Sequence, residues 1–176
     1  TGWVHDTLKV GDRVTLSGPY GRFFVRKSRG GALLFLAGGT GVSSPRSMIL
    51  DLLAEGCDAP ITLIHGVRTE ADLYDRDLFE GLQAKHPNFR YVPALSAEPE
   101  GSAWAGERGF VHEVAERLFG GQFEGRTAYL CGPPPMIEAS IGALMKGRLF
   151  EKHIFTERFL TASDGAEKKS PVFRRI

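Results

Sequence analysis

The sequence predicts an α/β fold in which helices cover both faces of a parallel β-sheet. Beyond residues 27–31, short apolar stretches alternate with longer stretches of helical periodicity, which is the pattern of strands joined by crossover helices. The apolar stretch 33–37 runs directly into a glycine-rich turn and then into a helix start. The chain has 176 residues, of which 42% are hydrophobic, so it is long enough to bury one sizeable core.

This alternation gives the expected elements in chain order. Expected strands lie at about 33–37, 61–66, 89–94, 126–131 and 153–159. Expected helices lie near residues 44–55, 75–85, 111–119 and 134–146. The first of these helices carries Met48, Ile49 and Leu52 on one stripe, so it is expected to pack against the sheet. Residues 96–109 are polar and glycine-rich and are expected to form a surface loop.

The residues before the alternating part have a different character. Residues 10–26 predict two short strands around the turn Ser17–Gly21, in the style of a small β-barrel. We therefore expect residues 1–29 to be distinct from the α/β domain at 30–160, and residues 161–176 to be a polar C-terminal tail. The chain begins without an initiator Met, which raises the alternative that it is a fragment of a longer protein.

Charge and hydropathy exclude several classes of partner. A formal net charge of +1 argues against a broad electrostatic contact with nucleic acid or with a membrane surface. No apolar run reaches transmembrane length and no signal peptide opens the chain, so a cytoplasmic location is expected. We expect a monomer whose partner is a small molecule or another protein.

Two cysteines, Cys57 and Cys131, are too few for a disulfide framework, a four-cysteine iron–sulfur site or a structural zinc site. Cys57 follows a helix end and is expected to be inert. No metal site is therefore expected in this chain.

The turn after the first strand has the features of a phosphate cradle. Gly38, Gly39 and Gly41 allow positive φ angles and let a ligand approach the backbone closely. The helix that starts at Ser44 or Pro45 offers unpaired N–H groups and a positive dipole end to an anion, with Ser44 as the expected N-cap and Pro45 at the first helical position. The turn lacks the G-x-G-x-x-G spacing, so a tight strand-to-helix turn without a ligand is the alternative.

Three strand tips are expected to converge. In open parallel sheets ligands lie across the carboxyl ends of the strands, where this sequence places residues 38–41, 66–69 and 131–136. In the last tip, Gly132 and three prolines stiffen the backbone and hold Cys131 at the mouth of the crevice. The alternative is a small buried residue followed by a helix that proline initiates.

These tips resemble the nicotinamide-binding domain of the ferredoxin–NADP reductase superfamily. The resemblance rests on Gly38–Gly41, Arg68–Leu73 and Tyr129–Met136, in that order along the chain. More narrowly, three further segments resemble the reductase component of multicomponent phenol hydroxylases: Gly18–Val25, Ser43–Leu53 and Met145–Glu151.

The resemblance implies a doubly wound five-stranded parallel sheet of order 3-2-1-4-5 at residues 30–160, with residues 1–29 as the last strands of an FAD-binding β-barrel. It implies hydride transfer from NADH to FAD, and electron transfer onward through a [2Fe-2S] centre to a di-iron phenol hydroxylase. The chain lacks the Arg-x-Tyr-Ser flavin motif and the ferredoxin cysteines, so most of the FAD site, the cluster and the hydroxylase contact would lie outside it. The alternatives are a nucleotide-binding module without turnover, or the sister reductase of a toluene or methane monooxygenase.

By the same resemblance, Gly38, Gly39, Thr40 and Gly41 hold the pyrophosphate of the dinucleotide. The tip formed by Cys131, Gly132, Pro133 and Pro134 borders the nicotinamide. Cys131 and Glu157 lie nearest the chemistry, Cys131 as a neighbour of the reacting carbon and not as a nucleophile. Glu157 and Phe159 face the flavin ring, with an edge-strand carboxylate and a core aromatic as the alternative.

The remaining assignments also keep their alternatives. Asp72 would bind the adenosine ribose and repel a 2′-phosphate, which favours NADH. It also has the spacing of a capping box with Thr69, which needs no ligand. Arg68 would meet the cofactor's pyrophosphate or a 2′-phosphate. His5 occupies the family's flavin-phosphate serine position or is a surface histidine, and His65 is expected to be a satisfied strand residue.

Overall fold

The computed structural model describes residues 2–18 and 20–159, and its core is a six-stranded, all-parallel sheet. The strand order across the sheet is β4-β3-β2-β1-β5-β6. In chain order the strands are β1 (Ala32–Gly38), β2 (Ile61–Val67), β3 (Phe89–Leu95), β4 (Glu107–Arg108), β5 (Arg126–Gly132) and β6 (Ile154–Arg158).

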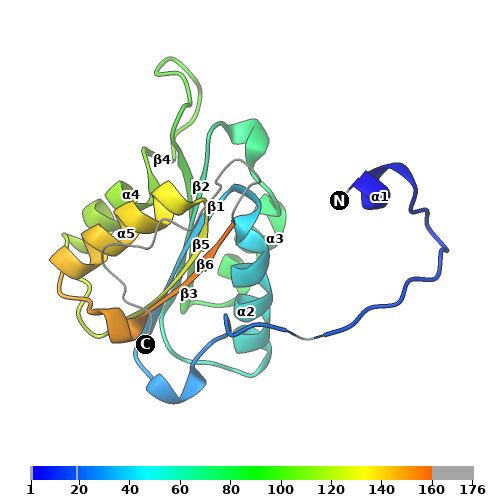
Figure 1. Cartoon of the computed structure of the whole chain (residues 1–176). Coiled ribbons are helices and arrows are strands. Elements are labelled where there is room, and N and C mark those ends of the chain that lie inside the picture. Colours follow the sequence, from blue (N-terminus) through cyan, green and yellow to red (C-terminus); the bar gives the residue numbers. More distant parts are fainter. Residues whose placement is uncertain (1, 19, 160–176) are drawn as a thin grey trace.

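Helices cover both faces of the sheet (Figure 1). The α-helices are α1 (Gly2–Asp6), α2 (Ser43–Ala54), α3 (Arg76–Lys85), α4 (Val111–Phe119) and α5 (Pro134–Lys146). Short 3₁₀ turns are η1 (Lys27–Arg29), η2 (Gly39–Val42), η3 (Glu70–Asp72) and η4 (Glu151–His153). Helices α2 and α3 pack on one face and α4 and α5 on the other.

Each face has its own apolar core, and β1 contributes to both. Leu33 and Phe35 pack with α2 and α3, whereas Leu34 and Leu36 pack with α4 and α5. A parallel strand that is buried on both faces needs a continuous apolar run, which is what the sequence shows here. Full burial of each such side chain contributes about 1.5–3 kcal/mol to stability.

The predicted alternation is confirmed for the long elements. The five long strands lie in the expected order 3-2-1-4-5, and the four long helices begin and end within a residue or so of their expected limits. The expected total of five strands is wrong, because β4 adds a sixth strand beside β3 inside the expected loop 96–109. A strand of two polar residues is too short to show an alternating hydrophobic pattern in the sequence. It is recognised only from its backbone pairing with β3.

The structure contains no strand at residues 10–18 or 20–26, so the prediction of two short strands there is wrong for the described part of the segment. Most of this segment leaves the domain as an extended arm that carries α1 at its far end (Figure 1). Val10, Leu16 and Tyr20 are exposed along it. A strand needs a neighbour to pair its backbone groups, and a lone two-stranded hairpin is marginally stable at best. The expected tail at 161–176 lies outside the described residues.

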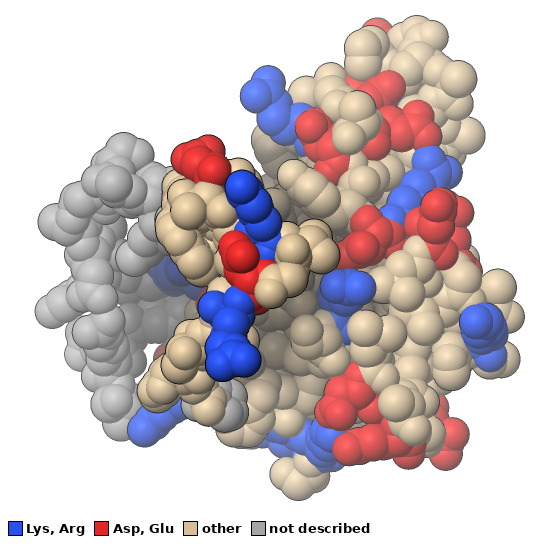
Figure 2. Space-filling model, turned by 90° about the vertical axis from the view of Figure 1, so that its right-hand side faces the viewer, with Lys and Arg blue, Asp and Glu red and all other residues tan. Residues whose placement is uncertain are grey.

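Positive and negative side chains are interspersed on one face of the molecule (Figure 2). Figure 2 shows lysine and arginine beside aspartate and glutamate over the face that it displays, in keeping with the formal net charge of +1. Among the described residues, no helix combines the length and the apolar character needed to cross a bilayer.

Candidate functional site

The carboxyl ends of three central strands meet at one edge of the sheet, as the sequence predicts. In the strand register Gly38 at the end of β1 lies beside Gly66 of β2. Ala37 of β1 lies beside Cys131 of β5, and Cys131 in turn lies beside Glu157 of β6. The structure therefore brings the glycine-rich turn, the Cys131 tip and Glu157 together.

The glycine-rich turn needs glycine for two different reasons. Gly39 has a φ of 55°, in the left-handed region that favours glycine. Gly41 instead lies against β5, where an added Cβ would collide with the carbonyl oxygen of Cys131 and lie 3.1 Å from the Cα of Gly132. A Cβ at Gly38 would lie 2.6 Å from the Met136 sulfur. The backbone of the turn is thus closely packed against β5 at Gly41 and against Met136 at Gly38. It leads through η2 directly into α2.

Ser44 does not act as the N-cap that the sequence predicts. Helix α2 begins one residue earlier, at Ser43, with Val42 in the N-cap position and no side-chain cap, so Pro45 is its third residue and not its first. The Ser44 hydroxyl donates instead to Glu157 Oε2 over 2.6 Å. Sequence reasoning missed this contact because the two residues are 113 positions apart.

Cys131 and Ser44 share one carboxylate oxygen. The Cys131 thiol lies 3.6 Å from Glu157 Oε2, the same atom that accepts the Ser44 hydroxyl. The pKa of Cys131 is raised to about 12, mainly by burial and then by the charge of Glu157, while the hydrogen bond of Ser44 opposes the shift. Cys131 is therefore a neutral thiol at neutral pH and no nucleophile. It is buried, not exposed at the mouth of the crevice.

We expect Glu157→Gln to lower the pKa of Cys131, because it removes a negative charge next to the thiol. We expect Ser44→Ala to raise that pKa, because it removes a hydrogen bond that favours the thiolate. The measurement is the rate of Cys131 alkylation at a fixed alkaline pH, followed by mass spectrometry in a Cys57→Ser background. The first variant should react faster than the parent and the second more slowly. Rates that move together, or not at all, would contradict this electrostatic account.

Phe159 follows β6 and lies beside the same tip. Its backbone N–H donates to the Gly132 carbonyl oxygen over 3.1 Å, and its side chain is 39% exposed. The alternative of a core aromatic is therefore wrong for Phe159. Glu157 is half-buried, with its carboxylate held by Ser44.

Asp72 forms a capping box with Thr69, which was the alternative to a ribose contact in the sequence analysis. Its Oδ2 atom accepts the Thr69 backbone N–H over 3.0 Å and the Thr69 hydroxyl over 2.9 Å. Arg68 lies at the end of β2 with an exposed side chain. Both residues therefore stand at the same sheet edge as the glycine-rich turn, and their contacts with a nucleotide remain predictions.

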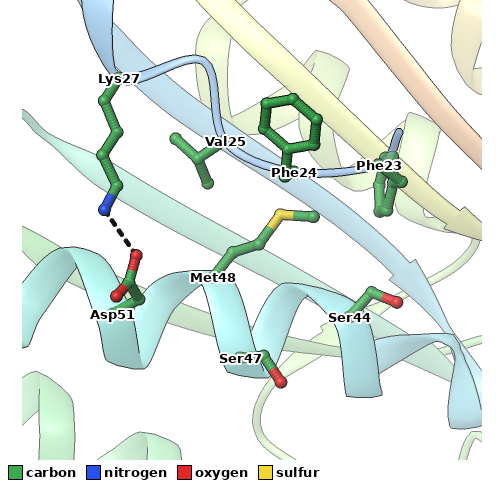
Figure 3. Close-up of a pocket in the computed structure, with 8 residues that line it drawn as sticks. All are labelled: Phe23, Phe24, Val25, Lys27, Ser44, Ser47, Met48 and Asp51. Carbon is green, nitrogen blue, oxygen red and sulfur yellow. Dashed lines mark hydrogen bonds and ion pairs between the residues drawn. The ribbon is translucent and has the colours of Figure 1, made fainter. Parts of the chain in front are cut away.

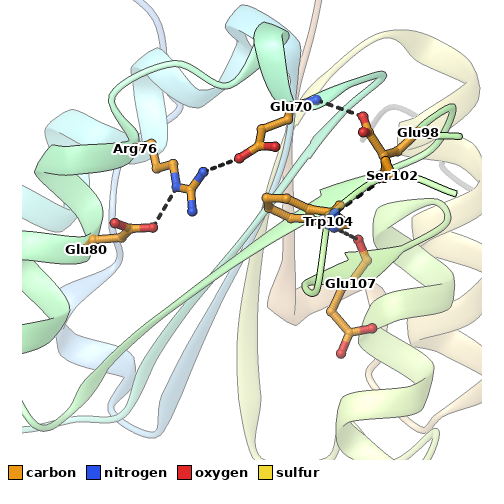
Figure 4. A network of polar contacts seen from close by, with 7 residues as sticks. All are labelled: Glu70, Arg76, Glu80, Glu98, Ser102, Trp104 and Glu107. Carbon is orange, nitrogen blue, oxygen red and sulfur yellow. Dashed lines mark hydrogen bonds and ion pairs between the residues drawn. The ribbon is translucent and has the colours of Figure 1, made fainter. Parts of the chain in front are cut away.

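The expected loop 96–109 is ordered by a polar network that sequence reasoning missed (Figure 4). Trp104 Nε1 donates to the Glu107 carbonyl oxygen over 3.0 Å. The Arg108 guanidinium donates to the Ser102 hydroxyl and to three backbone carbonyls. The Glu98 carboxylate accepts the Glu70 backbone N–H over 3.1 Å, which ties the loop to η3.

Arg76 lies beside this loop, and its guanidinium is ion-paired with two glutamates. It pairs with Glu70 over 2.6 Å and with Glu80 over 2.7 Å, and its guanidinium stands 5.5 Å from the centre of the Trp104 ring. Glu80 and Glu70 raise the pKa of Arg76. The region around η3 thus presents the carboxylates of Glu70, Asp72 and Glu98, while the neighbouring arginine is already paired.

A cavity of about 520 Å³ lies between residues 23–27 and helix α2 (Figure 3). Phe24 and Met48 supply apolar walls, and Ser44 lines one end. Lys27 pairs with Asp51 over 2.6 Å at the other end. Sequence reasoning gave no sign of this cavity, because its two sides are far apart in the chain.

His5 is not brought to this site. It lies on α1, exposed, at the end of the extended arm (Figure 1). Its assignment to a flavin phosphate stays a prediction.

The chain is similar in sequence to a family of NAD-binding domains and to protein components of phenol hydroxylases. The family model described as "Oxidoreductase NAD-binding domain" matches residues 35–141. The chain is 58% identical to the phenol 2-monooxygenase reductase component DmpP of Pseudomonas sp. (strain CF600), with 100% of this chain and 50% of that protein covered. It is 52% identical to the phenol hydroxylase P5 protein of Acinetobacter pittii (strain PHEA-2), with the same coverage. The chain thus spans about half the length of these relatives.

A solved structure shares the fold. The Amycolatopsis cytochrome P450 reductase GcoB superposes with a TM-score of 0.80 at 35% identity, over 90% of this chain and 47% of that one. The range of the family model, residues 35–141, includes the glycine-rich turn and the Cys131 tip.

Proposed function

The chain belongs to the oxidoreductase NAD-binding domain family, and from this we propose that it is the NADH-binding part of a flavin-dependent reductase that delivers electrons to a phenol hydroxylase. One observation carries the proposal. The glycine-rich turn and the Cys131–Glu157 pair lie at one sheet edge, where open parallel sheets bind their ligands. The names of the two relatives at 58% and 52% identity favour phenol hydroxylase. A xylene/toluene monooxygenase electron transfer component of Pseudomonas putida is 34% identical.

The residues present fit a dinucleotide. The backbone at Gly41 packs so closely on β5 that a side chain is excluded there, and the turn leads into the start of α2, where a pyrophosphate would meet backbone N–H groups. Arg68 would add a positive charge near the phosphates. The backbone of Cys131, Gly132, Pro133 and Pro134 would border the nicotinamide. When bound, NADH supplies a hydride.

The chain's own residues would orient the reactants and keep charge away from them. Cys131 stays neutral because its pKa is raised to about 12, so it would place no thiolate beside the nicotinamide. Ser44 holds the Glu157 carboxylate at the same place. Glu157 and Phe159 would face the flavin from the end of β6. Fixing two reactants in one geometry is the main contribution that a protein makes to hydride transfer between cofactors.

NADH is favoured over NADPH by the charges around η3. The carboxylates of Asp72, Glu70 and Glu98 lie in or beside η3, and Arg76 is paired with Glu70 and Glu80. A 2′-phosphate there would meet the negative charge of Asp72 and Glu98, because the charge of Arg76 is engaged by Glu70 and Glu80. Asp72 would accept a ribose hydroxyl through its second carboxylate oxygen.

The other cofactors would be held mainly by parts of the protein outside this chain. A plant-type [2Fe-2S] cluster takes four cysteine thiolates, and this sequence has two cysteines, of which Cys131 is buried. The cluster, and the ferredoxin domain that would contact a di-iron hydroxylase, would therefore lie outside these 176 residues. Residues 1–29 would complete an FAD-binding barrel there, with His5 at a flavin phosphate, and the exposed apolar side chains of the arm fit such a role.

A second reading is a nucleotide-binding module without turnover of its own. The described residues of the arm, 10–18 and 20–26, form no strand, which favours that reading for the chain in isolation. Visible flavin absorption of the purified chain separates the two, because only a chain that retains FAD is yellow.

We expect the chain to bind NADH at least about tenfold more tightly than NADPH, a difference of about 1.4 kcal/mol. The measurement is a paired calorimetric titration with the two nucleotides, repeated in the presence of FAD. Equal affinity would contradict the role of the η3 carboxylates. Binding of neither nucleotide by a folded chain, with or without FAD, would overturn the proposed function.

A further inference from the structure

His65 is a buried titratable side chain that the site described above does not use. It lies on β2, fully buried, one residue before Gly66. Within residues 2–18 and 20–159, the buried polar side chains are His65, Thr127 and Ser140. A fully buried imidazole requires a partner for its ring nitrogens, so its contacts indicate why the strand carries a histidine there. The expectation of a satisfied strand residue is confirmed.

The two ring nitrogens link the glycine-rich turn to a neighbouring strand. His65 Nε2 lies 3.1 Å from the Gly39 carbonyl oxygen. Nδ1 lies 3.5 Å from the hydroxyl of Tyr91 on β3. A carbonyl oxygen only accepts, so Nε2 must carry the proton, and in the neutral ring Nδ1 is then the acceptor for the Tyr91 hydroxyl. The contacts therefore specify one tautomer of His65.

The surroundings keep this arrangement unchanged near neutral pH. Burial lowers the pKa of His65, which outweighs the opposing effects of the Gly39 carbonyl and the Asp75 carboxylate. Burial raises the pKa of Tyr91 to about 12, so its hydroxyl keeps the proton that it donates. The ring of Tyr91 is itself fixed by stacking on Phe79, with 5.0 Å between ring centres.

The residue that His65 contacts is the one with the left-handed backbone in the turn, Gly39, with a φ of 55°. A carbonyl oxygen carries partial negative charge and would repel a pyrophosphate if it faced the ligand. A hydrogen bond to His65 holds this oxygen toward the sheet. The same hydrogen bond also gives the Nε2–H group of the buried His65 a partner, without which its burial would be costly.

We propose that His65 is a positioning residue for the nucleotide-binding turn: its Nε2–H holds the Gly39 carbonyl inside the protein, so that an anionic ligand meets backbone N–H groups instead of this oxygen. The inference rests on the proposed function and extends it to a side chain that does not touch the ligand. Sequence reasoning could not reach it, because the contact joins residues 26 positions apart on different elements.

The test compares two substitutions that differ in one hydrogen-bond donor. His65→Gln keeps an N–H donor close to the position of Nε2, whereas His65→Leu fills a similar volume without a donor. We expect His65→Leu to weaken NADH binding by about tenfold or more, and His65→Gln to stay within about threefold of the parent chain. Calorimetry gives the affinities, and thermal unfolding shows that each variant is folded. Tyr91→Phe removes the hydroxyl that donates to Nδ1 but leaves the Nε2 donor in place, so it should weaken NADH binding less than His65→Leu does.

A second readout needs no ligand. The imidazole ¹⁵N shifts of the free chain should show a protonated Nε2 and an unprotonated Nδ1 near neutral pH. A protonated Nδ1 with a bare Nε2 would overturn the proposal, as would a folded His65→Leu variant that binds NADH like the parent. A parent chain that binds neither NADH nor NADPH would instead overturn the proposed function, and the role of His65 with it.

Discussion

Replacing Gly41 with alanine is expected to weaken NADH binding by at least about tenfold and to lower stability by about 1–3 kcal/mol. An added Cβ would collide with the Cys131 carbonyl oxygen and lie 3.1 Å from the Gly132 Cα. Both are backbone atoms of β5, so no side chain can rotate away to make room. The turn must therefore move off the strand, and the cradle between β1 and β5 opens. Calorimetry with NADH and thermal unfolding measure the two effects.

Gly81→Ala is the matched control for this substitution. Gly81 lies within α3, and an added Cβ there would meet nothing within 4 Å. Alanine is favoured over glycine inside a helix by up to about 1 kcal/mol, so this variant should be as stable as the parent or more so. Its NADH affinity should not change. A Gly41→Ala chain that behaves like Gly81→Ala would show that the turn tolerates a side chain and is no close-fitting cradle.

Replacing Tyr129 with alanine is expected to cost about 3–5 kcal/mol of unfolding free energy. Tyr129 is fully buried on the central strand β5. Its ring stacks between Phe35 and Phe155, with ring centres 5.1 and 5.3 Å away. The substitution would leave a cavity between two aromatic rings that the strands hold in place. Urea unfolding followed by circular dichroism measures the loss.

Tyr129→Phe separates packing from hydrogen bonding. The Tyr129 hydroxyl accepts the Arg26 backbone N–H over 2.8 Å, which ties the segment before β1 to the sheet. Loss of this hydroxyl alone should cost about 1 kcal/mol. Equal losses for the two variants would show that the hydrogen bond, and not the aromatic stack, is the dominant contribution of this residue.

The long elements could be predicted because their patterns are strong and local. Strands such as β1 are buried on both faces and therefore read as unbroken apolar runs. Helix α5 begins with proline and carries Ile137, Ile141 and Leu144 at helical spacing. The strand order within the sheet came with the family resemblance, since no local pattern determines which strands are neighbours.

The differences between prediction and structure arise from contacts that a local pattern does not contain. Strand β4 has two residues and exists only through its pairing with β3. The arm at 10–26 has strand-like residues but pairs with no strand in the part of the chain that the structure describes. Ser44 has the type of side chain that caps helices, but its hydroxyl donates a hydrogen bond to Glu157, which is far away in the sequence.

The sequence predicts where some residues of the candidate site lie and leaves two alternatives for the role of others. The glycine-rich turn and the Cys131 tip follow from their places after strands, and the structure brings them together. For Asp72 the sequence allowed both a capping box and a ribose contact. The structure confirms the first, and a carboxylate has a second oxygen with which to make the other.

Backbone amide NMR shifts of the chain, recorded as NADH is added, show where on the sheet the nucleotide binds. We expect the largest changes at Gly38–Gly41, Arg68 and Gly132, at the carboxyl ends of β1, β2 and β5. The far end of α4, around Phe119, should stay unchanged. Shift changes confined to residues away from this sheet edge, or none with NADH in large excess, would contradict the account.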